Sequence, residues 1–321
     1  MLTRMFSVSR QTARHALEVL DGEGLLLRRQ GSGTFLKSGR FDEVRKRRKI
    51  AVITTYIDSY IFPKMLKGIE STLYNAGYLL QISYTNNTFS RETMILTEIA
   101  QNDEVAGIII EGTKSSMPDP NIDILRSLQE KCIPILFINC RPEGIQAPLV
   151  SLDDREAAYA ATEYLIKRGH KNIAGIFKLD DGQGRLRYAG YREALLAYNL
   201  PIRDEQILWY DTTDMNEWME GSTGSPLKRA GGCTALMCYN DQMASCVLQY
   251  KPDDLDLSII SIDNSELATM CSPHLTGVDH PKEELGHKAA ELILEMLRNE
   301  TKVQDYFFAP VICERDSVKN L

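Results

Sequence analysis

Three side chains near the N-terminus have the type and spacing needed to read DNA bases. Arg10 and Arg14 lie four positions apart, so both guanidinium groups would point the same way on a helix, with Gln11 beside them. In the major groove an arginine can bond guanine bidentately, and a glutamine can bond adenine. The sequence therefore predicts that this segment contacts base edges.

A second set of polar side chains occurs mainly where apolar runs end, and their chemistry suits a sugar. Asp, Asn and Arg bond sugar hydroxyls in pairs, and tyrosine rings cover the apolar face of a sugar. The candidates are Tyr56, Asp58, Tyr60, Glu111, Asn139, Asp153, Asp154, Lys178, Asp180, Asp181, Arg187, Asn240, Asp241 and Asp263. For any single one, a helix N-cap or a turn is the better interpretation, and Asp154 and Asp241 could cap the helices that they precede. Their joint recurrence favours a binding cleft.

A helix and a hairpin are predicted to position the first set. Ser9 is placed to N-cap a helix whose apolar residues fall at i, i+3, i+4 and i+7 from Ala13. Gly22 and Gly24 end this helix. Residues 25–29 and 34–36 then read as two strands around a glycine-rich turn, which would approach a phosphate backbone or a minor groove.

The second set lies in a long α/β pattern that begins at residue 50. Strands are expected at 50–56, 79–85, 106–112, 133–139, 173–179, 207–211, 234–240 and 257–263, with helices near 63–76, 91–101 and 121–131 between the first four. This alternation predicts two doubly wound parallel sheets in two similar lobes, with a ligand bound between them at the carboxyl ends of the strands. No GxGxxG or GxxxxGK[ST] motif follows a strand, which argues against a nucleotide site.

Composition limits the class of protein. The chain has 321 residues, 43% of them hydrophobic and 25% charged, as in globular proteins. Neither a signal-type apolar run near Met1 nor an apolar stretch of about 20 residues occurs, so a cytoplasmic protein without a membrane segment is expected. The seven cysteines show no CxxC pair and no metal-type spacing with the five histidines, so reduced, buried thiols and no metal or cofactor are expected.

Charge is distributed unevenly along the chain. Residues 1–49 carry 12 Lys and Arg against 5 Asp and Glu, whereas the remaining residues carry 25 against 39. A basic head on an acidic body places a polyanionic partner at the N-terminus. Residues 38–49 end in the run RKRRK and are interpreted as a linker that either lies along phosphates or is merely solvated.

The N-terminal text SVSRQTARHAL…EGLLLRRQGSGTFL resembles the recognition helix and wing of the GntR-type winged-helix repressors. The resemblance covers roughly the second half of that family's head, so a partial winged helix is expected over residues 1–37. It implies contacts to bases or phosphates from the helix and insertion of the wing tip into a minor groove. The DNA-binding residues expected on this basis are Ser9, Arg10, Gln11, Thr12, Arg14, Gln30, Gly31 and Ser32.

Three segments of the body resemble the LacI/GalR-type effector core, which is similar to periplasmic sugar-binding proteins: GHKNIAGI, RYAGYREAL and TALMCYNDQMA. Three further segments are similar to the arabinose-responsive repressors, which join such a core to a GntR-type head: TTYIDSYIFP, GIFKLDDGQG and GVDHPKEELG. The resemblance implies that Arg187, Asn240, Asp263 and His280 line the effector cleft. It also implies L-arabinose as the inducer. After Asn240 and Asp241, the helix is expected to be shorter than in that family.

These observations favour a dimeric repressor that binds operator DNA and that a sugar releases from the DNA. The effector domain is expected at 50–321, with lobe 1 at about 50–149 plus 281–298, and lobe 2 at about 150–275 plus 300–321. The effector-binding residues proposed from sequence are Tyr56, Asp58, Tyr60, Glu111, Asn139, Asp153, Lys178, Arg187, Asn240, Asp263 and His280. The alternatives are a truncated sugar-binding regulator with defective DNA binding and, less favoured, a transport-type sugar-binding protein. An enzyme is not expected, because no nucleophile–base pairing is visible.

Overall fold

The computed structural model describes residues 9–22, 26–29, 33–36, 49–57, 60–219, 226–252, 254–298 and 303–321. The chain divides into two compact units, a head of residues 1–48 and a body of residues 49–321. Asp58, the wing-tip residues Gln30, Gly31 and Ser32, and residues 38–48 of the basic linker lie outside the described residues. Within the described residues, no helix has the length and apolar character needed to span a bilayer.

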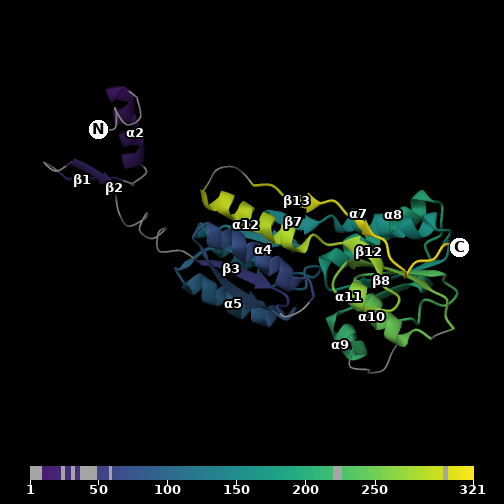
Figure 1. Cartoon of the computed structure of the whole chain (residues 1–321). Coiled ribbons are helices and arrows are strands. Elements are labelled where there is room, and N and C mark those ends of the chain that lie inside the picture. Colours follow the sequence, from purple (N-terminus) through teal and green to yellow (C-terminus); the bar gives the residue numbers. More distant parts are fainter. Residues whose placement is uncertain are drawn as a thin grey trace. The chain divides into compact units, whose positions relative to one another are not determined.

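The head contains the helix and the hairpin that its sequence predicts. Helix α2 (Arg10–Gly22) begins directly after Ser9, whose hydroxyl accepts the backbone N–H of Thr12 at 3.0 Å. Ser9 is therefore the N-cap of the helix, as expected. Strands β1 (Leu26–Arg29) and β2 (Gly33–Leu36) pair antiparallel, with Leu26 opposite Leu36 and Arg29 opposite Gly33 (Figure 1).

Lobe 1 of the body is a parallel six-stranded sheet in the order β13-β7-β6-β5-β3-β4. Its strands are β3 (Lys49–Thr54), β4 (Leu79–Tyr84), β5 (Val105–Glu111), β6 (Ile135–Ile138), β7 (Leu149–Leu152) and β13 (Tyr306–Phe308). Alternate residues of β3 face opposite sides: Ile50 and Val52 pack under helices α4 (Phe62–Asn75) and α12 (Lys282–Arg298). Ala51 and Ile53 pack under α5 (Phe89–Gln101) and α6 (Ile122–Glu130). Both faces of the sheet are covered, which explains its nearly continuous apolar strands.

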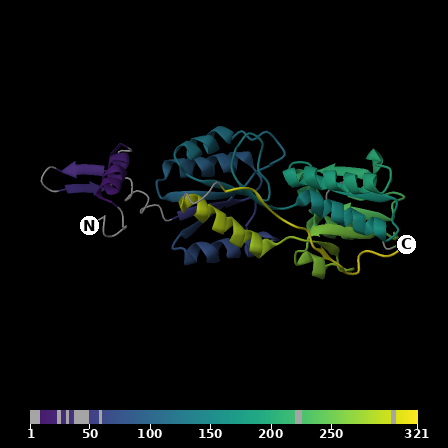
Figure 2. The same cartoon turned by 90° about the horizontal axis from the view of Figure 1, so that it is seen from above.

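Lobe 2 repeats this design with the sheet order β14-β12-β11-β10-β8-β9. Its strands are β8 (Ile173–Lys178), β9 (Ile207–Tyr210), β10 (Ala235–Cys238), β11 (Ser258–Asp263), β12 (Thr276–Asp279) and the antiparallel edge strand β14 (Ile312–Cys313). Helices α7 (Asp154–Lys167) and α8 (Gly182–Ala197) cover one face, and α9 (Thr212–Met219) and α10 (Asp241–Tyr250) cover the other. The short elements η1 (Asp204–Gln206) and α11 (Leu267–Met270) lie in connections. The two-lobed α/β fold expected from sequence is confirmed (Figure 1, Figure 2).

The strand pairings change the expected boundary between the lobes. Strand β7 was expected to open lobe 2, and residues 306–308 were expected within it, but both pair in the sheet of lobe 1. A strand belongs to the lobe in whose sheet it pairs, and β7 hydrogen-bonds to β6, while β13 hydrogen-bonds to β7. The chain consequently crosses between lobes three times, after β7, after β12 and after β13. These crossings lie together, since Asp153 N–H donates to Phe308 O at 2.9 Å and Asp279 N–H donates to Val311 O at 2.8 Å.

All seven cysteines are free thiols, as expected from their spacing. Cys140, Cys233, Cys238 and Cys246 are buried, but Cys132 is exposed, so the expectation of a buried thiol is wrong there. Cys132 follows the last turn of α6 with a positive φ of 59°, outside the strand that it precedes.

Two glycines allow α4 and α12 to cross in close contact. A Cβ on Gly68 would lie 2.2 Å from Glu283 O, and a Cβ on Gly286 would lie 2.1 Å from Met65 O. Because the opposing atoms are backbone, they cannot rotate away. We expect Gly68→Ala and Gly286→Ala each to lower the free energy of unfolding by about 1–3 kcal/mol, measured by urea denaturation.

Gly231→Ala is the matched control, since nothing lies within 4 Å of its added Cβ. Equal stabilities for all three variants would contradict the close crossing.

Candidate functional site

A cleft of about 550 Å³ lies between the carboxyl ends of the two sheets. Both switch points of strand order, β3/β5 in lobe 1 and β8/β10 in lobe 2, open into it, as doubly wound folds predict. The sequence-predicted residues that line it are Tyr56, Tyr60, Glu111, Lys178, Arg187, Asn240 and Asp263, together with Asp181. Asn139, Asp153 and His280 are absent from its lining, and Asp58 lies outside the described residues.

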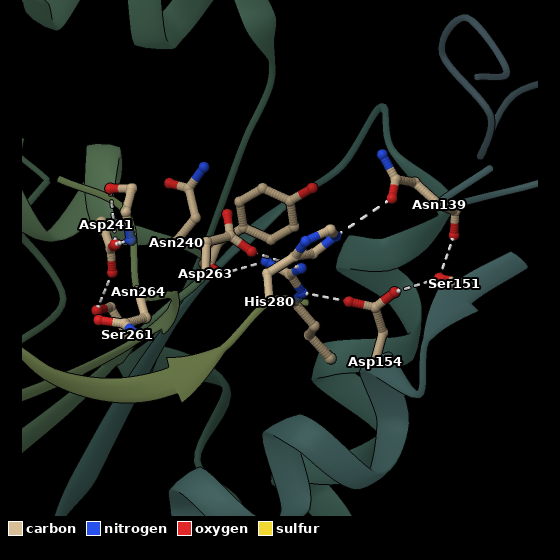
Figure 3. A network of polar contacts seen from close by, with 12 residues as sticks. Asn139, Ser151, Asp154, Asn240, Asp241, Ser261, Asp263, Asn264 and His280 are labelled. Carbon is tan, nitrogen blue, oxygen red and sulfur yellow. Dashed lines mark hydrogen bonds and ion pairs between the residues drawn. The ribbon is translucent and has the colours of Figure 1, made fainter. Parts of the chain in front are cut away.

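Arg187 is the central cation of the cleft floor. It projects from α8, is 1% exposed, and its Nε lies 2.7 Å from Asp154 Oδ1 while Nη2 lies 3.3 Å from Asp263 Oδ1. Its Nη1 donates to Tyr239 O at 2.6 Å. Dashed lines from Asp154 and Asp263 mark these ion pairs in Figure 3. Burial alone would lower the pKa of this guanidinium, but the two carboxylates outweigh burial and raise it, so Arg187 stays charged.

Tyr60 connects the lobes on one side of the cleft. Its hydroxyl donates to Asp263 Oδ2 and accepts the backbone N–H of Asp241 at 3.3 Å. Tyr60 belongs to lobe 1, whereas both partners belong to lobe 2. Burial and the neighbouring carboxylates raise the pKa of the Tyr60 phenol far above its usual value, so the hydroxyl remains a donor. These contacts therefore link lobe 1 to lobe 2 directly.

Asn87 connects the lobes at a second place, which the sequence did not indicate. Its Nδ2 donates to Thr212 Oγ1 at 2.9 Å and approaches Asp180 Oδ2 at 3.3 Å. Nearby, Gly182 N–H of lobe 2 donates to Ser115 Oγ of lobe 1 at 3.0 Å. Asn87 is 2% exposed and has a positive φ of 51°, a conformation that asparagine tolerates better than most residues. A single asparagine after a strand carries no signal of such a role.

Lys178 supplies the second cation of the floor. Its Nζ lies 2.7 Å from Asp181 Oδ2 and 3.5 Å from Asp180 Oδ1, and Tyr239 OH donates to Asp181 at 3.2 Å. Burial would lower the pKa of Lys178, but Asp181 and Asp180 more than offset it and hold it above its usual value. Both cations of the floor thus already have carboxylate partners.

The two aspartates expected as helix caps have other roles. The N-caps are the preceding residues: Asp153 accepts from Glu156 N–H at 3.1 Å, and Asn240 accepts from Met243 N–H at 3.0 Å. Asp154 instead pairs with Arg187, and Asp241 accepts from the hydroxyl and the N–H of Ser265. Each aspartate is the first residue of its helix, so its side chain points into the lobe instead of back over the helix end.

Asn139 and His280 form a layer behind Glu111, which belongs to the cleft floor. Asn139 Nδ2 donates to Glu111 Oε1 at 2.6 Å. On its other side, Asn139 Oδ1 lies 3.3 Å from His280 Nε2 (Figure 3). Burial lowers the pKa of His280 to about 4, so the ring is neutral at neutral pH. Asn139 and His280, which were expected in the cleft, therefore position Glu111 and sit at the lobe crossing instead of lining the cavity.

A buried acid in lobe 1 gives a testable pH dependence. Burial, reinforced by the charge of Asp119, raises the pKa of Glu92 to about 7, while Asn121 Nδ2 donates to it at 2.7 Å. The folded state therefore retains a proton that the unfolded chain releases near its ordinary pKa of 4.5. The contribution of Glu92 to the free energy of unfolding is fully present below pH 4.5. It is lost as the pH rises to 7, and this loss amounts to about 3 kcal/mol.

In urea denaturation between pH 5 and 8, Glu92→Gln is expected to flatten the dependence of the free energy of unfolding on pH. Glu98→Gln, at an exposed position on the same helix, is expected to leave this dependence unchanged. The measured quantity is the slope of the free energy of unfolding against pH. A hydrogen bond lost on replacing the carboxyl group by an amide would lower that free energy equally at every pH and would not change the slope. Parallel slopes for both variants and the parent would exclude Glu92 as the titrating group.

Sequence reasoning missed part of the lining for two reasons. Tyr210 and Tyr239 follow strand cores and could have been included by the same strand-end rule. Met215, Asn216, Met219, Leu267 and Met270 come from α9 and α11, which reach the cleft only through the packing of lobe 2.

Comparison with known proteins extends these observations. Residues 1–36 match the bacterial regulatory proteins of the gntR family, and residues 162–318 match the periplasmic binding protein-like domain. The whole chain is 36% identical to an arabinose metabolism transcriptional repressor of Geobacillus stearothermophilus, of which it covers 90%. It is 35% identical to a repressor with the same description from Halalkalibacterium halodurans, with 94% of this chain and 83% of that protein aligned.

A solved structure agrees with the fold. The transcription regulator CcpA of Lactococcus lactis superposes with a TM-score of 0.72 at 25% identity, covering 84% of this chain and 99% of that one. The two lobes with a cleft between them are thus an arrangement found in an experimentally determined regulator.

Proposed function

This chain belongs to the family of arabinose metabolism transcriptional repressors, and on that premise we propose that L-arabinose or a related pentose, bound in the cleft, releases it from operator DNA. The relatives are repressors and not enzymes, in agreement with the sequence. The observation that carries the proposal is the joining of polar side chains and tyrosine rings from both lobes in one cleft.

The charge of the floor supports an uncharged ligand. Arg187 is neutralised by Asp154 and Asp263, and Lys178 by Asp180 and Asp181. These fixed groups present oriented donors and acceptors to hydroxyl groups and leave no spare positive charge for a phosphate or a carboxylate. The rings of Tyr56, Tyr60 and Tyr239 would cover the apolar face of a sugar. The effector residues proposed are Tyr56, Tyr60, Glu111, Lys178, Arg187, Asn240 and Asp263, with Asn139, Asp153 and His280 supporting them, and Asp58 remains a candidate from sequence.

The head is proposed to bind DNA through α2 and the wing. Gln11, Thr12 and Arg14 are exposed on the helix, while the Ser9 hydroxyl caps the helix by accepting the backbone N–H of Thr12. Arg10, Gln30, Gly31 and Ser32 complete the proposed contacts from sequence. Base contacts from such a helix would specify the operator, and lysines and arginines of residues 38–49 would add phosphate contacts.

We infer that two copies act together in the cytoplasm. Strand β4 is an edge of the lobe 1 sheet, and exposed apolar side chains gather on it and on α5: Leu79, Ile82, Tyr84 and Met94. An uncovered apolar edge strand favours pairing with a second copy. Two heads would then occupy two half-sites, and sugar-driven closure of the lobes would disfavour their simultaneous contact with DNA.

Fluorescence anisotropy of labelled duplexes from the neighbouring promoter tests this proposal, with L-arabinose and with D-glucose as control. Tight binding that L-arabinose releases is expected. Binding that no sugar releases would contradict L-arabinose or a pentose as effector. A dimeric, folded protein that does not bind at low salt would instead favour the alternative of a sugar-binding regulator with a defective head.

A further inference from the structure

The cleft consists of two chemically different parts. Its floor is polar and buried, with Glu111, Arg187 and Asp263 each no more than 6% exposed. Its outer wall, defined here as Met215, Met219, Leu267 and Met270, is apolar and comes from α9 and α11 of lobe 2. Met219 is 55% exposed and Met270 is 76% exposed. Large apolar side chains grouped in solvent at the mouth of a cavity mark a surface that another apolar group covers.

The size of the cleft leaves this wall unused by a free pentose. A pentose displaces on the order of five waters, or about 150 Å³ at the ~30 Å³ that each water takes in the liquid. The cleft encloses about 550 Å³, several times that volume. A sugar that bonds the floor would therefore leave the outer wall in contact with water.

The chemistry of the wall defines what fits there. Methionine side chains are flexible and polarisable, and they favour contact with aromatic rings. The polar lining residues on α9 and α10 are the neutral Thr212, Asn216, Gln242 and Ser245, and Glu266, which precedes α11, lies 3.9 Å from Lys64 of lobe 1. A second hydroxylated ring would find few fixed donors there, whereas an aromatic substituent would find four apolar side chains.

We propose that the outer wall is a subsite for an apolar group attached to the sugar, so that this protein binds aryl-substituted pentosides in addition to the free pentose. The proposal rests on the proposed function, because the floor must first anchor the sugar. The ring of the substituent would pack on Met219 and Met270 and remove their apolar surface from water.

Isothermal titration of the full chain with three ligands tests this inference: L-arabinose, methyl L-arabinopyranoside and para-nitrophenyl L-arabinopyranoside, each glycoside as both anomers. We expect the better para-nitrophenyl anomer to bind at least about tenfold more tightly than the matching methyl anomer, as burial of a phenyl-sized surface predicts. Equal or weaker binding of the para-nitrophenyl compounds, with L-arabinose still bound, would overturn the subsite alone. Absence of binding by all three would overturn the proposed effector as well.

Variants locate the effect. Met219→Gln and Met270→Gln keep the side-chain length at exposed positions, so the fold should be unaffected. Each is expected to reduce the para-nitrophenyl advantage severalfold while leaving the Kd for L-arabinose unchanged. Leu196→Gln, at an exposed apolar position on α8 that does not line the cleft, is the control. An advantage that survives in both variants would place the aryl group elsewhere and overturn the assignment.

Discussion

Replacement of Arg187 by methionine is expected to abolish the response to sugar and to lower the free energy of unfolding by about 3–5 kcal/mol. The change removes the donor that holds Asp154 and Asp263 together at distances of 2.7 and 3.3 Å. Two buried carboxylates would remain without their counter-ion, which is the most costly way to break a buried ion pair. In anisotropy, the variant should stay on operator DNA at L-arabinose concentrations that release the parent protein.

The same two helices supply a matched control. Arg155 of α7 pairs with Glu193 of α8 at 2.5 Å, but this pair lies in solvent. Arg155→Met should leave both stability and sugar release essentially unchanged, because exposed pairs contribute little. Arg187→Lys keeps the charge and should fold, yet it should bind L-arabinose at least about tenfold more weakly, since an ammonium cannot serve three fixed acceptors in the geometry of a guanidinium. Normal sugar release by Arg187→Lys would exclude Arg187 from the effector site.

Replacement of Arg14 by alanine is expected to weaken operator binding by about tenfold to a hundredfold, the range for a single base-reading arginine. Arg14 is exposed on α2 in the head, whereas the cleft belongs entirely to the body. The Kd for L-arabinose should therefore be unchanged, as measured by titration calorimetry in the absence of DNA. A fall in DNA affinity that is equal for specific and random duplexes would indicate a phosphate contact in place of a base contact.

Arg192→Ala is the control for general loss of positive charge, since Arg192 is exposed on α8 of the body. If Arg14→Ala and Arg192→Ala affect DNA binding equally, the assignment of α2 as the reading helix is wrong.

Strands and their carboxyl-end residues could be predicted because their signal is local. In the cores of β5 and β11, residues such as Ile109 and Ile260 are buried on both sides, so the apolar runs mark the strands and their ends mark the cleft. Seven of the eleven effector candidates line the cavity, six of them at a strand end or in the connection that follows it, and Arg187 from α8. The parallel arrangement alone brings Glu111 and Asp263 into one site.

The remaining features depend on contacts between distant segments. Asn87 and Thr212 meet across the lobes although 125 positions separate them, and nothing in either local sequence indicates the pairing. The placement of His280 behind the floor depends on Asn139, which lies 141 positions away. The sequence left Asp154 and Asp241 open as possible caps, whereas the caps are the preceding residues, Asp153 and Asn240, because the helix start is set by φ and ψ instead of residue type.

The three crossings between the lobes constrain how the protein is made. Lobe 1 receives α12 and then β13 only from residues 282–308, and residues Leu285, Ala289 and Ile293 of α12 belong to its core. A ribosome must therefore finish almost the whole message before the first lobe can close. Until then, the side of the sheet carrying Ile50 and Val52 is exposed to chaperones and proteases. A chain that ends before residue 282 would lack this part of the core of lobe 1, and its unfinished lobe would be open to proteolysis, although every strand of lobe 2 except β14 would already be made.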